Sequence, residues 1–169
     1  MSLSEYYNAW LTTETFDYAA FTWFGWGGAA LCMTLSNLGT AYGTAKSGMG
    51  IASMAVTRPD LAFKAIVPII MAGILSIYGL ILAVLITQNV KYDDTSKSHG
   101  LFFLQMNAGI VCGLSNAVAG YAIGLSGETG VRSYAINENI FVGLILILIF
   151  AEVLGLYGLI AGIIMSLAS

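Results

Sequence analysis

Residues 140–167 read IFVGLILILIFAEVLGLYGLIAGIIMSL, and this stretch decides the fold. Its only charged residue is Glu152, and nearly all the others are aliphatic, aromatic or small. At a rise of about 1.5 Å per residue, a helix of this length exceeds the roughly 30 Å hydrocarbon core of a bilayer. The stretch therefore predicts a transmembrane helix that carries one carboxyl group near its middle.

The composition of the whole chain excludes a soluble globular domain. Of its 169 residues, 58% are hydrophobic and 9% are charged, whereas soluble proteins are about 25% charged. The net charge of −3 and the six scattered basic residues give no basic surface for nucleic acid. Cys32 and Cys112 lie in apolar stretches without the spacing of a zinc site, so we expect both to be small buried side chains.

Hydropathy divides the chain into four apolar spans, which indicate an all-α integral membrane protein with four transmembrane helices. The spans are 20–47, 66–86, 102–126 and 140–167, separated by polar segments at 48–64, 88–101 and 127–139. Residues 1–19 form a short N-terminal segment, 20–87 and 102–169 form two helical hairpins, and 88–101 form the loop between them. An even number of crossings puts both termini and the 88–101 loop on one side of the membrane.

The basic residues predict which side that is. The side of the first and third connections holds four basic residues, namely Lys46, Arg58, Lys64 and Arg132. The opposite side holds two, Lys91 and Lys97. Cytoplasmic loops carry the excess of Lys and Arg, so we expect the first and third connections in the cytoplasm. The termini and the 88–101 loop are then lumenal.

The two hairpins form a tandem repeat. Tyr78-Gly79-Leu80-Ile81 reappears as Tyr157-Gly158-Leu159-Ile160, at an offset of 157 − 78 = 79 residues. The same offset aligns Leu35-Ser36-Asn37 with Leu114-Ser115-Asn116, and Tyr42 with Tyr121. It also aligns Gly73 with Glu152, so the carboxyl group is present in the second copy only.

Small residues line one face of the first span and one face of the third. The first face consists of Gly28, Cys32, Ser36, Gly39, Gly43, Ser47 and Gly50, and the second of Gly109, Gly113, Ala117, Gly120, Gly124 and Gly127. Such faces let helix backbones approach closely, either within one chain or between copies of the chain in a ring. We expect Asn37 and Asn116, at equivalent positions of the repeat, to form hydrogen bonds between helices.

Glu152 is the only acidic residue inside a span. A charge at the bilayer centre costs at least ~2.5 kcal/mol, and no Lys or Arg lies in the interior of a span to offset it, so we expect the protonated acid. Helical spacing places Glu152 between a small-residue face and an aliphatic stripe that we expect to face lipid. The face contains Ala151, Gly155, Gly158 and Gly162, and the stripe contains Ile145, Leu148, Ile149, Leu156, Leu159 and Ile163.

The run from Phe141 to Ile160 resembles the carboxylate helix of the c-type proteolipid family of vacuolar-type ATPases. Segments 36–39, 41–48, 58–59 and 71–74 resemble the first hairpin of that family. The resemblance implies a rotor ring in the membrane sector of an ATP-driven proton pump. It identifies Glu152 alone as the proton carrier. The supporting positions come from the sequence itself: Gly73 from the repeat offset, Ala151 and Gly155 from the small-residue face, and Tyr78 as a hydrogen-bond partner.

The resemblance also implies partners and a location. Copies of the chain and related proteolipids would form the ring, the a subunit of the stator would supply an arginine, and the d subunit of the central stalk would bind the cytosolic face. The chain would bind no cofactor and would not itself hydrolyse ATP. The expected location is the membrane of the vacuole and of lysosomal, endosomal and Golgi-type acidic compartments.

Several features limit or refine the resemblance. The segment through Trp23 and the loop end Asn137–Asn139 depart from the pattern, and Gly73 disfavours the paralogue c″, which carries its carboxylate in the earlier hairpin. Sodium-carrying relatives have a Thr-Gln pair where this chain has Ile74 and Leu75. Only Tyr78 then remains to hydrogen-bond Glu152, which favours H⁺ as the ion.

Other classes of protein stay open at this point. The fungal c′ paralogue fits as well as the c-type proteolipid itself, and four helices are also compatible with a channel or a junction-forming protein. A ring protein of the F-type synthases is usually one hairpin. An enzyme acting alone is disfavoured, because the single histidine, His99, lies in a loop without a nucleophile or paired carboxylate beside it.

Overall fold

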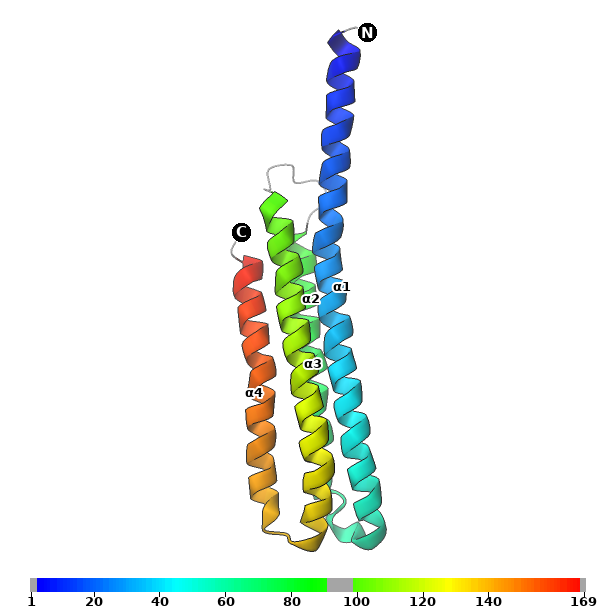
Figure 1. The fold of residues 1–169 in the computed structure, drawn as a ribbon, viewed down its shortest axis with the longest axis vertical. Helices are drawn as coiled ribbons and strands as arrows, with labels where there is room; N and C mark the ends of the chain where they lie inside the picture. The colour runs from blue at the N-terminus through cyan, green and yellow to red at the C-terminus, as the bar shows by residue number, and fades with distance from the viewer. Residues whose placement is uncertain (1–2, 91–98, 168–169) are drawn as a thin grey trace.

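The structure is a computed structural model that describes residues 3–90 and 99–167, with side chains from 22 to 90 and from 101 to 167. Four long helices run side by side (Figure 1). They are α1 (Leu3–Thr57), α2 (Val67–Asn89), α3 (His99–Ile136) and α4 (Ile140–Leu167), with two short 3-10 helices, η1 (Pro59–Leu61) and η2 (Lys64–Ile66), between α1 and α2. The predicted all-α architecture of two hairpins is confirmed.

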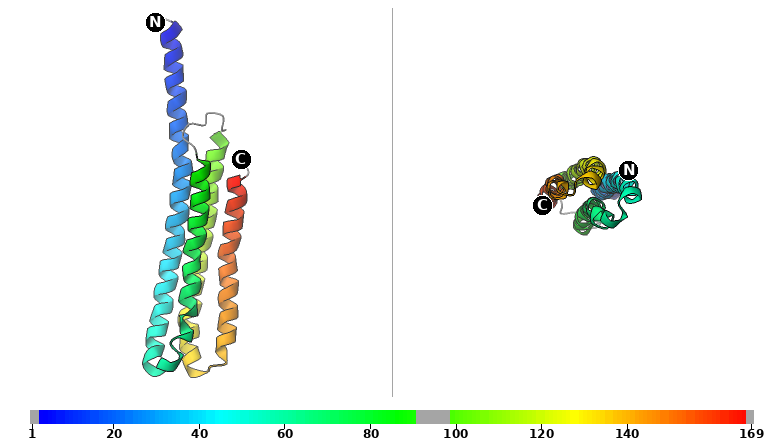
Figure 2. Two further views of the ribbon diagram at one scale, coloured as in Figure 1. Left: turned by 180° about the vertical axis from the view of Figure 1, so that it is seen from behind. Right: turned by 90° about the horizontal axis from the view of Figure 1, so that it is seen from below.

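Three segments are long and apolar enough to cross a membrane: Lys64–Asn89, Leu101–Ile136 and Ile140–Leu167. The described part of α1 does not reach that hydropathy, because glycine, serine, threonine and asparagine replace aliphatic residues along it. Figures 1 and 2 nevertheless show the later part of α1 running beside the other three helices, while its N-terminal turns extend beyond the end of the bundle. Its lower hydropathy reflects the small-residue face that it presents to α3.

Two of the predicted connections are wrong in extent. The segment 48–64 is helical as far as Thr57, and 127–139 is helical as far as Ile136, so the second turn comprises only 137–139. Polar residues can continue α3 because their side chains are satisfied within it. The Thr129 and Ser133 hydroxyls donate to the carbonyls of Leu125 and Thr129, and Arg132 pairs with Glu128 one turn away.

The other two polar segments are described only in part. Helix α1 already begins at Leu3, so the backbone of the predicted N-terminal segment 1–19 is helical from that residue and continuous with the first span. Of the predicted loop 88–101, the structure places the end of α2 at Asn89 and the start of α3 at His99, and residues 91–98 lie outside the described part.

The start of α1, the end of α2, the start of α3 and the end of α4 all lie toward one end of the bundle, as predicted (Figure 1). The two hairpin turns lie at the opposite end, where Arg58 and Glu138 join them by an ion pair of 2.6 Å. Near the same end, Glu128 pairs with Lys46 at 3.3 Å and with Arg132 at 2.8 Å. The end with the two hairpin turns is the one that we predict to be cytoplasmic.

The tandem repeat is visible in the packing. An ideal Cβ on Gly79 would lie 3.4 Å from the carbonyl oxygen of Cys32, and one on Gly158 would lie 3.4 Å from that of Val111. Since 158 − 79 and 111 − 32 both equal 79, the same helix contact occurs once in each hairpin. Repeat-related residues also meet across α1 and α3, as in the stacked rings of Tyr42 and Tyr121, whose centroids are 5.1 Å apart.

The two small-residue faces pack against each other within one chain. A Cβ on Gly28 would lie 2.6 Å from the carbonyl oxygen of Gln105, and one on Gly39 would lie 2.6 Å from that of Asn116. Backbone-to-backbone contact of this kind requires glycine. The Asn116 side chain is buried and donates to the Ser36 hydroxyl at 3.0 Å, as predicted. Asn37 is exposed in the single chain, so the same prediction is wrong for Asn37 inside this fold.

Candidate functional site

Glu152 lies near the middle of α4, with its side chain half-buried. Helix α4 starts after the tight turn at 137–139 and continues without interruption to Leu167, since its sequence contains no proline and no polar break. The uniformly apolar helix holds the carboxyl group far from both ends of the bundle. Helix geometry thus fixes the membrane depth at which any chemistry of Glu152 takes place.

Tyr78, from α2 of the other hairpin, contacts this carboxyl group. Its hydroxyl donates to Glu152 Oε1 at 3.4 Å, a long and therefore weak hydrogen bond. The predicted contact between these two residues is present in the structure. A hydroxyl donor can bond the carbonyl oxygen of a protonated acid as well as a carboxylate, so Tyr78 can hold the side chain in either state.

No cation lies beside Glu152 in the described part of the chain. Every ion pair found there involves Lys46, Arg58 or Arg132, with Glu128, Glu138 or Asp60 as acids at the turn end of the bundle. Because an unpaired charge in a low-dielectric region is strongly disfavoured, we expect the single chain in a bilayer to hold Glu152 as the neutral acid. The site can therefore exchange a proton only where a second component supplies water or positive charge.

Small residues next to Glu152 let α4 pack closely against α2 and α3. Ala151 is buried, and a Cβ on Gly155 would lie 2.6 Å from Leu75 Cδ2 and 2.7 Å from Asn116 Oδ1. No larger residue fits at position 155 without displacing these side chains. Ala151 and Gly155 thus set the distance between α4 and its neighbours, and with it the reach of Tyr78 to the carboxyl group.

The aliphatic stripe beside Glu152 does not all face outward, which corrects the prediction. Leu148 and Leu159 belong to the core, at 0% and 6% exposure. The outward face of α4 lies further round the helix, and its most exposed members are Val142, Phe150, Tyr157 and Ile164. Spacing predicts that Glu152 lies at the border between a packing face and the stripe, and the structure does place it at a border, between the buried side of α4 and this outward face. Only the extent of the outward face differs, because α2 and α3 pack against part of the stripe.

Gly73, the repeat-related position, does not contact Glu152. A Cβ added to Gly73 would have no atom within 4 Å other than those of its chain neighbours and the adjacent backbone of its own helix. The space beside Gly73 is therefore open. Leu75, which replaces a potential oxygen ligand, is fully buried against α4. Among the described residues, the hydroxyl of Tyr78 is the polar partner that the carboxyl group has.

One residue beside the site was missed in the sequence. The Ser115 hydroxyl donates to the carbonyl of Leu154 at 2.6 Å, two residues beyond Glu152, and so fastens this turn of α4 to α3. The repeat could have indicated this contact, because Ser115 is the repeat partner of Ser36. Ser115 packs against Gly158 of the next helix, as Ser36 packs against Gly79.

Comparison with known proteins agrees with this geometry. The model of the family described as the ATP synthase C subunit matches residues 27–86 and again residues 106–165. The two matches are offset by 106 − 27 = 79 residues, the offset of the repeat. Together they cover most of the chain, so each hairpin is one unit of this family.

Individual relatives carry the V-type name. Over 150 residues, 89% of this chain and 94% of the relative, the sequence is 55% identical to the 16 kDa proteolipid c subunit of the V-type proton ATPase of Homo sapiens. The protein of the same name from Nephrops norvegicus is 54% identical over 142 residues, 83% of this chain and 87% of that protein. The Caenorhabditis briggsae protein of this name that is numbered 2 is 48% identical over 154 residues, 90% and 96% of the two chains. The chain therefore belongs to the ATP synthase C-subunit family and, within it, to the 16 kDa proteolipids of V-type proton ATPases.

Proposed function

We propose that copies of this chain form the proton-carrying ring of a V-type proton ATPase, in which Glu152 binds and releases one proton per copy. The observation that carries the proposal is the lone carboxyl group at mid-membrane, held by a tyrosine hydroxyl and by no cation of the described chain. A structural acid would need no such position. An intramembrane ionisable group is by default a functional one.

The chemistry follows from the cost of ionisation. Relative to water, lipid disfavours the carboxylate of Glu152 by at least ~2.5 kcal/mol, a factor of about 70, and full desolvation of a carboxylate can raise this factor to about 10³–10⁵. As the ring turns, the protonated side chain therefore crosses the lipid without losing its proton. Where the a subunit of the stator places an arginine beside it, the carboxylate becomes the favoured form and the proton leaves toward the lumen. The side chain then reloads from the cytosolic side.

The translocated ion is H⁺ on the same argument. Sodium requires several oxygen ligands, whereas the surroundings of Glu152 supply one tyrosine hydroxyl, with Leu75 buried where a second ligand could stand. A proton needs only the carboxyl group itself. The half-buried position of Glu152 lets the proton enter and leave from the outer surface of α4 without opening the bundle.

The orientation and the other partners complete the proposal. The end with the two hairpin turns faces the cytosol and the d subunit of the central stalk, and both termini are lumenal. ATP hydrolysis belongs to the cytosolic sector and not to this chain. The pump acidifies vacuolar, lysosomal, endosomal and Golgi-type compartments.

The decisive experiment replaces Glu152 by glutamine in cells that carry no other copy and measures ATP-driven acidification of vesicles. Glutamine keeps the shape but cannot release a proton, so we expect the complex to assemble while acidification and coupled ATPase activity are lost. Glu138→Gln, the same change at the end with the hairpin turns, is the matched control and should pump normally. Normal acidification by Glu152→Gln vesicles would refute the proposed mechanism.

A further inference from the structure

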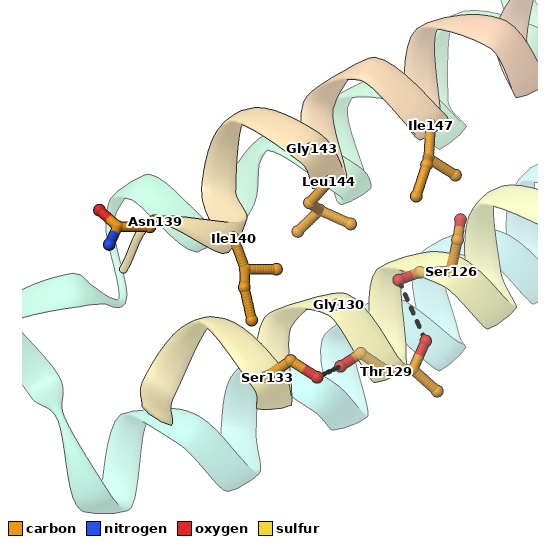
Figure 3. A pocket seen from close by; sticks show the side chains of 9 residues that line it. All are labelled: Ser126, Thr129, Gly130, Ser133, Asn139, Ile140, Gly143, Leu144 and Ile147. Carbon is orange, nitrogen blue, oxygen red and sulfur yellow. Dashed lines mark hydrogen bonds between the residues drawn. The ribbon is translucent and has the colours of Figure 1, made fainter. Parts of the chain in front are cut away.

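Hydroxyl groups near the turn end of α3 find their hydrogen-bond partners within their own helix. They line an open cavity of about 430 Å³ between α3 and α4. The Thr129 hydroxyl donates to the carbonyl of Ser126 and the Ser133 hydroxyl to that of Thr129, as the dashed lines of Figure 3 show. These side chains therefore need no polar partner from α4.

The amide of Asn116, near the middle of α3, is satisfied on one side only. Its side chain is fully buried, and its NH₂ group donates to Ser36 Oγ at 3.0 Å and to Cys112 Sγ at 3.5 Å. Its oxygen, Oδ1, is also buried but accepts no hydrogen bond from any residue that the structure describes. Most buried polar atoms have a partner, so the missing one requires an explanation.

This oxygen lies against α4, one helical turn from Glu152. An ideal Cβ on Gly155 would lie 2.7 Å from Asn116 Oδ1 and 2.6 Å from Leu75 Cδ2. The backbone of α4 supplies no donor there, because the N–H groups in the middle of a helix bond to carbonyls of the same helix. A donor for Oδ1 must therefore come from a side chain near Gly155.

The neutral acid of Glu152 lacks the complementary partner. Tyr78 donates its hydroxyl hydrogen to Oε1, so the acid carries its own hydrogen on Oε2 and needs an acceptor for it. Among the described residues, no acceptor is bonded to Glu152, and lipid offers none. A donor without an acceptor and a buried acceptor without a donor thus lie within one turn of α4.

We propose that Asn116 is a positioning residue for the proton: when Glu152 is neutral, its carboxyl group turns inward and donates from Oε2 to Asn116 Oδ1. Side chains three residues apart on a helix have Cβ atoms about 5–6 Å apart. The carboxyl oxygens of a glutamate reach about 3.5 Å beyond its Cβ, and the hydrogen bond adds about 2.7 Å. A change of side-chain rotamer at Glu152 therefore spans the distance. The inference rests on the proposed function, because it describes how the proton is held between loading and release.

The bond to Asn116 can form only while the proton is present. A carboxylate has no hydrogen to donate, and its oxygens would face the lone pairs of Oδ1. A hydrogen bond made only by the neutral form favours the neutral acid over the carboxylate. Tyr78, in contrast, can donate to either form. Asn116 thus retains the proton while Glu152 crosses lipid, and the ionised side chain is free to turn outward.

The first hairpin lacks this arrangement, although it contains the same asparagine. Subtracting 79 from Asn116 and Glu152 gives Asn37 and Gly73. Asn37 is exposed, and the position that would hold its carboxyl partner is a glycine. The buried amide and the carboxyl group therefore occur together in one hairpin, and Asn37 provides a control in the same chain.

Infrared spectroscopy of the full-length chain in lipid bilayers tests the bond, because the C=O stretch of a neutral acid responds to its hydrogen bonds. The band of Glu152 is the acid band that is absent from Glu152→Gln. Asn116→Leu combined with Ser36→Ala removes the acceptor without leaving the serine unpaired, and it should shift the band to higher wavenumber. Asn116→Ala should give the same shift without adding bulk to the core.

The matched control is Asn37→Leu, the same change at the repeat partner, which should leave the band in place. Circular dichroism checks that each variant keeps its helices. An unshifted band in the folded Asn116 variants would overturn the inference, since a purely structural amide would not alter the carboxyl group.

Acidification of vesicles separates this inference from the proposed function. Losing one hydrogen bond changes an equilibrium by about two- to tenfold, so Asn116→Leu with Ser36→Ala should slow ATP-driven acidification by a factor in this range. An unshifted band with acidification at the normal rate would remove Asn116 from the mechanism and leave Glu152 as the proton carrier. Normal acidification by Glu152→Gln would instead refute the proposed function, whatever the infrared band shows.

Discussion

Replacing Gly39 by alanine should force α1 away from α3. The new Cβ would lie 2.6 Å from the carbonyl oxygen of Asn116 and 2.7 Å from Cα of Ala117. Ordinary contacts between such atoms are about 3.5 Å or longer, so the helices must separate locally by about 1 Å. Both obstructing atoms belong to the backbone and cannot move aside by a change of rotamer.

The magnitude follows from a matched substitution. Gly73→Ala makes the same change of residue type within a helix, but the new Cβ meets no atom within 4 Å, and the repeat partner of Gly73 already accommodates a glutamate. Both variants gain the helix propensity of alanine, at most about 1 kcal/mol. Overpacking then lowers the free energy of unfolding of Gly39→Ala alone, by about 1–3 kcal/mol relative to Gly73→Ala.

The assay is reversible unfolding of the purified chain in mixed detergent micelles, followed by helical circular dichroism as the fraction of dodecyl sulfate rises. We expect Gly73→Ala to unfold at or above the dodecyl sulfate fraction that unfolds the unmodified chain, and Gly39→Ala to unfold clearly below it. Equal midpoints for the two variants would show that α1 and α3 are not held by close backbone contact at Gly39.

Three further predictions concern the site and its surroundings. Tyr78→Phe should slow acidification by no more than about tenfold, because the 3.4 Å hydrogen bond is weak; a loss as complete as that of Glu152→Gln would give the hydroxyl a larger role. A hydrophobic carbodiimide, which reacts with protonated carboxyls, should label Glu152 in preference to Glu128 and Glu138, and the labelling should fall as pH rises; equal labelling of all three by mass spectrometry would contradict a neutral Glu152. Asn116→Leu should lower the free energy of unfolding by about 1–3 kcal/mol, because it leaves the buried Ser36 hydroxyl without its donor; Ser36→Ala added to it should recover part of the loss in the same unfolding assay.

Much of the fold could be read from the sequence because the membrane imposes simple rules. Apolar length located the helices, and the 79-residue offset gave the hairpin repeat, which reappears in the equivalent contacts of Gly79 and Gly158. The helix ends at Thr57 and Ile136 could not be read in this way. Hydropathy marks where lipid ends, whereas a helix ends where its backbone and side-chain hydrogen bonds fail.

The candidate site, like the fold, could be predicted from the sequence only in part. The isolation of Glu152 was evident from composition alone. The burial of Leu148 and Leu159 was not, because helical spacing gives the angle of a residue on its own helix but not the position of the neighbouring helix. Nor could spacing separate Asn37 from Asn116, whose sequence contexts are equivalent; only the second faces another helix of the same chain.

The loss of one carboxyl group from the repeat has a mechanical consequence under the proposed function. Each hairpin occupies one place in the ring, but only the second carries a proton, since Gly73 stands where Glu152 does. A ring of given circumference therefore moves half as many protons per turn as one with a carboxyl group in every hairpin. For a fixed free energy of ATP hydrolysis per turn, twice as much is available for each proton, which permits a steeper pH gradient. The open space at Gly73 means that packing does not forbid a second carboxyl group. Its absence is therefore better explained by the gradient that the pump must sustain than by the fold.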